Sequence, residues 1–241
     1  MVVGKVFYLI PAGTPIPVFS GMNKGLRWVR GAANAPEWMG IYERDKQRLL
    51  QKYVRHGMTV FDIGANAGFY SLGLSRMVGT RGRVIAFEPF GKNVEKILRH
   101  IRLNGLENIQ VVQAAVAKSD GLCAFNFGES DFEGSLAGNH AGQYLVPTVQ
   151  LGAGLSKGIL PYPDLLKIDV EGAESQLLEG SAVMLAEHHP VIFLALHGSA
   201  QKTLCHSILR SLNYTIEDFD GIPISAADQM PDEVIAYFRN V

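Results

Sequence analysis

The chain has 241 residues, of which 47% are apolar and 19% charged, with 22 basic against 23 acidic side chains. This apolar content excludes a disordered chain, and the balanced charge disfavours nucleic acid as a partner. The longest apolar stretches, residues 6–10 and 191–196, are too short to cross a membrane. We therefore expect no membrane association and one domain over residues 1–241, large enough to bury a full core.

The two cysteines indicate the cellular compartment in which the protein is expected. Cys123 and Cys205 form no C-x-x-C pair, and Cys205 with His206 lacks the spacing of a zinc site. Both cysteines are interpreted as small apolar core residues. Unpaired cysteines suit a reducing environment, so the sequence predicts a cytoplasmic protein.

The first half of the chain alternates predicted strands and helices. The apolar region at residues 6–10 is shorter than the roughly 7–15 residues of a signal peptide, and it predicts a short strand instead. Hydrophobic periodicity then predicts a helix at 41–56, a strand at 58–63, a helix at 69–78, a strand at 83–88, a helix at 92–104 and a strand at 109–114. Such alternation is typical of a parallel sheet covered by helices on both faces.

The second half interrupts this rhythm and then resumes it. The composition of residues 115–150 predicts an insertion, with a strand at 122–127 and a polar loop from 128 to 142. Further elements are predicted as a strand at 165–169, a helix from 173, a strand at 191–196, a helix at 200–212 and strands at 214–219 and 233–238. The short connection between the last two strands favours an antiparallel pair. Residues 1–56 are an N-terminal extension and cover, and 57–241 form the α/β core.

The richest segment in chemistry follows the first core strand. The strand ends in Asp62, and a loop containing Gly64 and Gly68 leads into the next helix. At the carboxyl edge of a parallel sheet such a loop commonly holds a ligand, because glycine lets the backbone approach it closely. The spacing is G-x-x-x-G, which matches neither the dinucleotide fingerprint nor the phosphate-binding P-loop. Two structural turns would also explain the glycines.

The acidic residues at the strand ends narrow the choice of ligand. Asp62 favours a ligand that carries a positive amine, and Glu88 ends the next strand, where an acid can accept hydrogen bonds from both ribose hydroxyls. A ligand with an amine and a ribose but no phosphate is S-adenosylmethionine. The sequence therefore predicts this cofactor, and the combination disfavours purely structural turns.

A second acidic segment lies at residues 164–174. Its strand ends in Asp169, and Glu171 and Glu174 follow within one turn. Strand alternation places Lys167 on the same side as Asp169. An acidic helix start would account for Glu174, since carboxylates are favourable near a helix N-terminus. It does not account for Asp169 at the same sheet edge as Asp62.

The order of these motifs resembles one known family. Asp-Ile-Gly-Ala-Asn-Ala-Gly-Phe-Tyr-Ser, Ala-Phe-Glu-Pro and Lys-Ile-Asp-Val-Glu-Gly-Ala-Glu follow each other as in the FkbM family of S-adenosylmethionine-dependent methyltransferases. The resemblance covers residues 40–197. It implies the class I methyltransferase fold, a Rossmann-like, mostly parallel seven-stranded sheet with a C-terminal antiparallel hairpin. It also implies methyl transfer to a hydroxyl of a sugar, a polyketide or another small secondary metabolite.

The resemblance also implies roles for particular residues. Matching positions place the methionine end of the cofactor against one group of residues, namely Asp62, Gly64, Asn66 and Gly68. Glu88 would hold the ribose, and backbone near Ala115 would meet the adenine. The family commonly has an acid two positions before the His that ends the later strand. Here that segment is Ala195-Leu196-His197, so the His is present and the acid is not.

Methylation of an alcohol requires removal of its proton, and three residues are candidates for this step. Asp169, Glu171 and His197 are all predicted near the carboxyl ends of neighbouring strands, and His197 has the most suitable unperturbed pKa. His197 could equally be a histidine with a purely structural role. No spacing demands a divalent cation, so no metal is predicted. We expect the acceptor to be covered by the segment before the first core strand, which includes Tyr42 and Glu43, by residues 128–145, or by both.

Two other functional classes remain open at this point. A binding module that holds the cofactor or a nucleotide without methylating anything would have the same glycine loop and acidic strand ends. A nicotinamide-dependent oxidoreductase is a third interpretation. The sequence determines neither the identity of the acceptor nor the oligomeric state.

Overall fold

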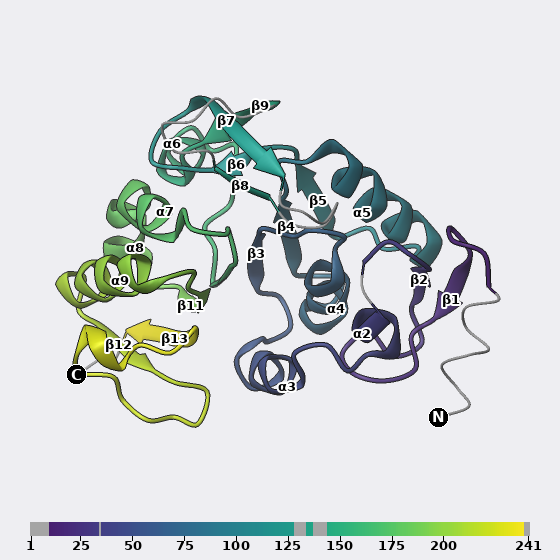
Figure 1. Cartoon of the computed structure of the whole chain (residues 1–241), viewed down its shortest axis with the longest axis horizontal. Coiled ribbons are helices and arrows are strands. Elements are labelled where there is room, and N and C mark those ends of the chain that lie inside the picture. Colours follow the sequence, from purple (N-terminus) through teal and green to yellow (C-terminus); the bar gives the residue numbers. More distant parts are fainter. Residues whose placement is uncertain (1–9, 34, 128–133, 137–143, 239–241) are drawn as a thin grey trace.

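The computed structural model describes residues 10–33, 35–127, 134–136 and 144–238 (Figure 1). Its central sheet contains β3 (Thr59–Ile63), β4 (Arg83–Phe87), β5 (Ile109–Val112), β10 (Leu165–Ile168), β11 (Val191–Ala195), β12 (Tyr214–Glu217) and β13 (Glu233–Phe238). Their spatial order is β12-β13-β11-β10-β3-β4-β5. β13 is antiparallel to both of its neighbours, and the other pairs are parallel. The predicted fold, a mostly parallel seven-stranded sheet with a C-terminal antiparallel hairpin, is confirmed.

Both faces of the central sheet are buried, which explains why its strands are continuously apolar. Successive side chains point to opposite faces, so Val60 joins one core cluster while Phe61 and Ile63 join the other. The same alternation along β4 places Val84 in the first cluster and Ile85 in the second. The sheet is therefore sandwiched between two hydrophobic layers.

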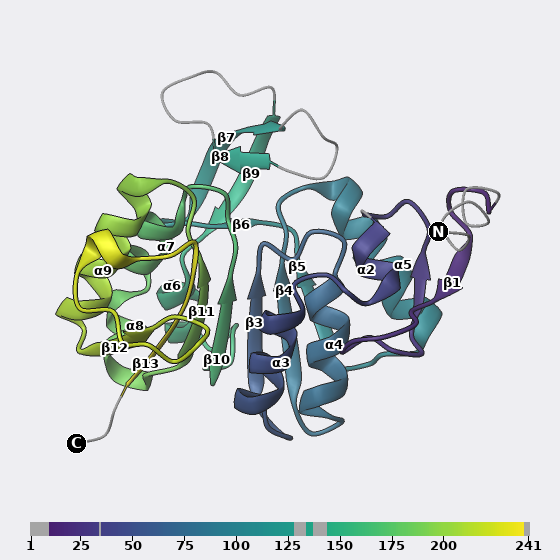
Figure 2. The ribbon, with the colours of Figure 1, turned by 60° about the horizontal axis from the view of Figure 1, so that its bottom comes forward.

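The helices divide between these two layers. On one side lie α3 (Arg44–Tyr53), α4 (Phe69–Val78) and α5 (Gly91–Asn104), and on the other lie α6 (Leu151–Ser156), α7 (Glu174–Gly180), α8 (Ala182–His188) and α9 (Ser199–Ser211). Figure 2 shows the two groups on opposite sides of the central strands. Short glycine-containing turns end several helices, as Gly79 ends α4 and Gly105 ends α5. The doubly wound arrangement brings the ends of the parallel strands to one edge.

The N-terminal segment packs on the outside of α4 and α5. It contains a two-stranded antiparallel sheet of β1 (Pro15–Pro17) and β2 (Arg27–Val29), followed by the short α2 (Ala35–Met39). Trp28 is fully buried and stacks on His100 of α5 with ring centroids 4.1 Å apart, and Asn23 donates to the Phe69 carbonyl (2.7 Å). Trp28 is thus a core residue, and the extension is an integral part of the hydrophobic layer.

The insertion forms a second sheet apart from the first. It comprises β6 (Ala115–Val116), β7 (Gly121–Phe127), β8 (Gly134–Leu136) and β9 (Tyr144–Val149), in the order β6-β9-β7-β8. Figure 2 shows β7, β8 and β9 projecting at the top of the view, away from the central strands. The predicted interruption of the α/β rhythm is therefore confirmed. Most of the predicted loop at 128–142 lies outside the described residues.

The predicted elements agree with the structure except at boundaries. The helix predicted at 41–56 begins only at Arg44, because Glu43 adopts a left-handed conformation (φ 42°). The helix predicted from 173 divides at Ser181 into α7 and α8. The strand predicted near residues 6–10 lies almost wholly outside the described residues. In the part of the chain that the structure describes, no helix is long and apolar enough to cross a membrane.

Candidate active site

The loop after β3 is fixed between the ends of two neighbouring strands. The amides of Gly64 and Ala65 both donate to the Phe87 carbonyl at the end of β4 (3.0 Å each). On the other side, a Cβ at Gly64 would collide with the backbone carbonyl of Asp169, and the φ of Gly64 is +77°. Only glycine satisfies both conditions, because a side chain would have to displace backbone. Gly64 therefore sets how closely β3 and β10 approach at this edge.

Asp62 lies beneath this loop and has two protein partners. It is fully buried and accepts a hydrogen bond from the Ser71 hydroxyl (2.6 Å). Its other oxygen lies 3.3 Å from Nζ of Lys167, which also donates to the Gly64 carbonyl (2.9 Å). Neighbouring Asp62 and Asp169 raise the pKa of Lys167 against the opposing effect of its burial, so this lysine stays charged. Lys167 is thus a structural cation rather than a base.

Glu88 lies at the end of β4 and holds the far side of the same loop. Its carboxylate accepts from the Asn66 amide (2.8 Å), the Phe90 amide (3.0 Å) and the Asn93 side chain (3.4 Å). Burial raises the pKa of Glu88 to about 7, and the hydrogen bonds from Phe90 and Asn66 only partly offset this effect. Hydrogen-bond donors thus favour the ionised form of Glu88. Hydroxyl groups of a ligand would be donors of the same kind.

A second group of side chains surrounds His197, which follows β11. Its Nδ1–H donates to Glu174 (2.6 Å), while Nε2 lies 3.3 Å from Oε2 of Glu171 and 3.7 Å from Oδ1 of Asp169. Glu171 reaches this position because it adopts a left-handed φ of 51°, directly before Gly172 (φ 97°). Such strained backbone conformations concentrate at functional sites. The fold therefore brings the three predicted catalytic residues together.

The neighbouring carboxylates determine the protonation state of His197. The hydrogen bond to Glu174 and the charges of Glu171 and Asp169 raise the pKa of His197 to about 9, although partial burial acts in the opposite direction. The imidazole therefore carries a proton at neutral pH. The choice of His197 as the base rests on its unperturbed pKa, which these surroundings change. Which of the three residues removes a proton stays a prediction.

A network of tyrosines and charged residues adjoins the site on the side of α3. The Tyr70 hydroxyl donates to Glu43, and Lys46 pairs with Glu43 (2.6 Å) and with Glu233. Glu233 is the strand partner of Ala195, the position at which the family commonly has an acid. Burial raises the pKa of Tyr70, so the phenol keeps its proton and does not act as a base.

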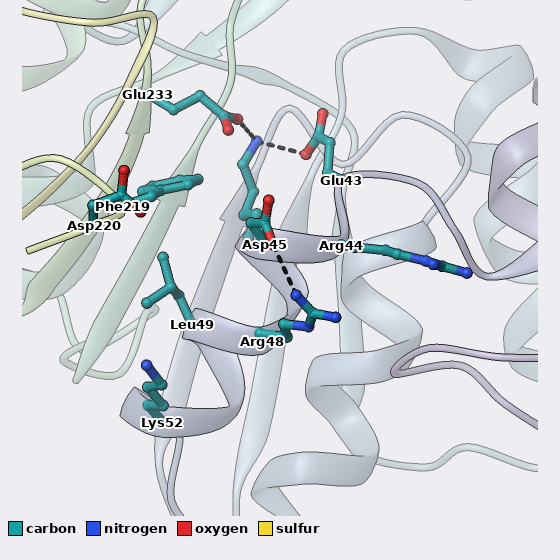
Figure 3. A pocket seen from close by; sticks show the side chains of 10 residues that line it. Glu43, Arg44, Asp45, Arg48, Leu49, Lys52, Phe219, Asp220 and Glu233 are labelled. Atoms are coloured by element: carbon teal, nitrogen blue, oxygen red, sulfur yellow. Dashed lines mark hydrogen bonds and ion pairs between the residues drawn. The ribbon is translucent and has the colours of Figure 1, made fainter.

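A cavity of about 380 Å³ opens beside this network (Figure 3). In Figure 3, dashed lines join Glu43, which directly precedes α3, and Glu233 of β13 to the same amine, Nζ of Lys46. The cavity is lined by charged residues and two apolar side chains, namely Glu43, Arg44, Asp45, Lys46, Arg48, Leu49, Lys52, Phe219, Asp220 and Glu233. The cavity thus lies beside the N-terminal half of α3, and Asp169, Glu171 and His197 are not among the residues that line it.

The remaining predicted residues lie along the same edge or just beyond it. Gly68 precedes α4 with a φ of 91°, and Asn66 lies between the two glycines with a φ of 49°. Ala115 is buried in β6, the first strand of the second sheet, where it pairs with Thr148 of β9. Whether backbone near Ala115 contacts an adenine stays a prediction, as do the cofactor-binding roles of Asp62, Gly64, Asn66, Gly68 and Glu88.

Sequence reasoning did not identify Glu174 as part of the site. Its place after Asp169 suggested only an acidic helix start, but the fully buried carboxylate instead holds the ring of His197. The two residues lie 23 positions apart in the sequence. They meet because β10 and β11 are adjacent parallel strands, so the segments that follow them emerge side by side. No local pattern could have indicated this contact.

The sequence profile of the methyltransferase FkbM domain matches residues 62–240, which contain all of these strand ends. The chain belongs to the FkbM methyltransferase family. This confirms the resemblance, and it supports methyltransferase function. The match begins at Asp62 and therefore leaves the N-terminal extension outside the family domain.

Individual relatives are distant. Hexuronic acid methyltransferase AglP from Haloferax volcanii is 24% identical over 139 residues, which represent 57% of this chain and 56% of AglP. Methyltransferase FkbM from Methylobacillus flagellatus KT has a structure with a TM-score of 0.51 and 18% identity, covering 86% of this chain and 56% of its own. This chain thus spans little more than half the length of either protein.

The chain matches a larger share of a third similar protein. The SAM-dependent O-methyltransferase from Thermotoga maritima has a TM-score of 0.51 and 16% identity, and the superposition covers 98% of this chain and 81% of that one. At such identities the structural likeness shows a shared fold and nothing of the substrate. That fold is the Rossmann-like α/β fold of class I methyltransferases.

Proposed function

We propose that this FkbM-family protein uses S-adenosylmethionine to methylate a hydroxyl group on a sugar or another small metabolite. The observation that carries the proposal is the buried carboxylate of Glu88 at the end of β4, which holds the glycine loop through the Asn66 amide. An acid at this position can accept hydrogen bonds from both ribose hydroxyls of a nucleoside, and the loop beside it matches no phosphate-binding motif. Asp62 lies fully buried beneath the loop, where it pairs with Lys167 and holds the loop in place.

When bound, S-adenosylmethionine supplies a methyl group that its sulfonium has already activated. The residues of this chain would position the acceptor and receive its proton. Asp169, Glu171 and His197 lie at the carboxyl ends of β10 and β11, next to the strand that carries Asp62. Well-oriented reactants can lower a barrier by roughly 7–11 kcal/mol, and a positioned base adds about 10²–10⁴-fold. Alignment is therefore the larger contribution.

A sugar acceptor is supported by one observation. The matched relative AglP is named a hexuronic acid methyltransferase. We therefore place sugars, including acidic ones, first among the acceptor classes.

Binding and catalysis are tested separately. Calorimetry with S-adenosylhomocysteine is expected to give one site per chain, and Glu88→Gln is expected to weaken binding at least tenfold. The matched control is Glu217→Gln, since this carboxylate also accepts a side-chain hydrogen bond but lies at the opposite side of the sheet, on edge strand β12. Absence of heat with both the cofactor and its demethylated product would contradict the proposal.

Methyl transfer is then assayed with radiolabelled S-adenosylmethionine and a panel of glycosides, free hexuronic acids and polyketide alcohols. Turnover of a sugar that Asp169→Asn abolishes, while S-adenosylhomocysteine affinity is retained, supports the assignment. Cofactor binding without turnover of any acceptor would favour the non-catalytic binding module. Binding of NADH that S-adenosylmethionine does not displace would favour an oxidoreductase.

A further inference from the structure

Three side chains at the ends of β10 and β11 converge on one point. Asp169, Glu171 and His197 each offer one ligand atom, and these atoms all lie within 4.8 Å of one another. The ligands are two carboxylate oxygens and Nε2 of the imidazole, which lies 3.3 Å from Glu171 and 3.7 Å from Asp169. Sequence analysis predicted no metal because no spacing demanded one. The convergence arises only when two separate strands are placed side by side.

Glu174 provides a second and independent observation. This carboxylate is fully buried, and one of its oxygens accepts from Nδ1–H of His197 (2.6 Å) and from the Gly172 amide (2.9 Å). Its other oxygen is buried without a hydrogen-bond partner among the residues that the structure describes. A histidine that ligates a metal almost always donates its other ring N–H to a carboxylate or carbonyl, which fixes the ring orientation. Glu174 turns Nε2 of His197 toward Asp169 and Glu171 in this way.

The charge of the cluster favours an added cation. Asp169 and Glu171 face Nε2 of His197, and Glu174 faces Nδ1. The nearest lysine, Lys167, is 3.6 Å from Asp169 but is shared with buried Asp62. When Nε2 of His197 is free to bind a metal, the imidazole is neutral. The four carboxylates of Asp62, Asp169, Glu171 and Glu174 then face only the charge of Lys167, so the cluster is negative. Like charges this close are unfavourable unless a cation lies between them.

We propose that Asp169, Glu171 and His197 bind one divalent cation, with Glu174 as the residue that positions the imidazole. Imidazole is a ligand typical of Zn²⁺, whereas carboxylates are typical of Mg²⁺ and Mn²⁺. We choose Mn²⁺ as the probe because it accepts both kinds of ligand. The side chains of Asp169, His197 and Glu171 are 22%, 34% and 42% exposed, so coordination positions stay open to water or an acceptor hydroxyl.

The use of this site rests on the proposed function, although its existence does not. A hydroxyl oxygen coordinated to a divalent cation loses its proton more readily than a free hydroxyl. A cation on Nε2 of His197 would take the place of a proton there, and it would promote ionisation of the acceptor alcohol. Binding of Mn²⁺ is measured without methyl donor or acceptor, so failure of the metal site and failure of the methyltransferase assignment are distinguishable.

The first test is calorimetric titration of EDTA-treated, dialysed protein with Mn²⁺. The wild-type chain is expected to bind one ion, and His197→Gln and Asp169→Asn are each expected to weaken binding at least tenfold. The matched control is His188→Gln, because His188 pairs with one carboxylate, that of Glu187 on α8 (3.9 Å), and packs on the Tyr162 ring away from the cluster. This control is expected to bind Mn²⁺ like the wild type. Circular dichroism confirms that each variant is folded.

The second test requires no substitution of a proposed metal-binding residue. Pulsed electron paramagnetic resonance of the wild-type chain with bound Mn²⁺ is expected to show coupling to one imidazole ¹⁴N. Glu174→Gln is expected to keep this coupling while weakening binding by about 10–100-fold, the usual effect of losing an outer carboxylate partner. The proposal is overturned if the wild type binds no Mn²⁺ at millimolar concentration, if no ¹⁴N coupling is present, or if His197→Gln and Asp169→Asn bind like the wild type.

Discussion

Lys167 and Asp62 are direct neighbours across two parallel strands, and they form an ion pair in the buried interior of the sheet edge. The register of β10 against β3 places the two residues opposite each other, with Nζ 3.3 Å from the Asp62 carboxylate. Nζ also lies 5.3 Å from the centre of the Tyr70 ring, and it donates to the Gly64 carbonyl. The buried ammonium group of Lys167 thus connects β3, the glycine loop and β10, the strand that directly precedes Asp169.

Replacement of Lys167 by Met is expected to destabilise the protein by about 3–5 kcal/mol, because it leaves the buried Asp62 carboxylate without its cation. The double variant Lys167→Met with Asp62→Asn is expected to recover part of this loss. Urea unfolding of both variants measures the difference. Equal stability of the single and double variants would show that Asp62 does not depend on Lys167.

Gly64→Ala is expected to be more damaging than substitution of another glycine with the same backbone conformation. The matched control is Gly57→Ala, since Gly57 has a φ of +89° but, among the residues that the structure describes, no atom lies within 4 Å of an added Cβ. The control is expected to cost about 1–2 kcal/mol, the strain of a left-handed residue with a side chain. Gly64→Ala adds a collision with the Asp169 carbonyl. Thermal unfolding and S-adenosylhomocysteine titration should both show a larger loss for Gly64→Ala than for the control.

Cofactor affinity is expected to depend on the ionisation of Glu88. Burial raises the pKa of this carboxyl to about 7, and only the ionised form accepts hydrogen bonds with both oxygens. Affinity for S-adenosylhomocysteine should therefore rise about tenfold between pH 6 and pH 8, as the ionised fraction grows. Calorimetry at a series of pH values measures this rise. In Glu88→Gln the rise should disappear, and its persistence there would assign it to another group.

Stability is expected to fall as His197 loses its proton. The pKa of His197 is about 9 in the folded chain against 6.5 for an unperturbed imidazole, so the folded state binds the proton more tightly. The resulting stabilisation is fully present below pH 6.5 and is lost between pH 6.5 and 9. We expect about 1–2 kcal/mol after allowance for solvent screening of this partly exposed ring. Urea unfolding in EDTA, compared with His197→Gln, measures the change.

Glu174→Gln gives an independent check on the same effect. The hydrogen bond from His197 to Glu174 is the largest cause of the raised pKa, so its loss should move the imidazole pKa back toward 6.5. Nuclear magnetic resonance of the imidazole nitrogens follows this pKa directly. An unchanged pKa in Glu174→Gln would mean that Glu171 and Asp169 alone hold the proton on His197.

The sequence by itself determined the fold class and the composition of the sheet edge. Continuous apolar strands alternating with amphipathic helices require a parallel sheet that is buried on both faces, and each strand of such a sheet ends at the same edge. Asp62, Glu88 and Asp169 could therefore be placed at that edge without coordinates. The spacing of Gly64 and Gly68 likewise excluded dinucleotide and P-loop motifs, because those depend on local backbone geometry.

Only the tertiary structure decided how the side chains at this edge pair with each other. Sequence periodicity specifies which face a residue occupies, but not which strands become neighbours or in what register they lie. The contact between Glu174 and His197, the surroundings that raise the histidine pKa to about 9, and the convergence with Glu171 all depend on the adjacency of β10 and β11. Desolvation and charge coupling act through space, so the acid–base behaviour of the site follows from the fold rather than from any local motif.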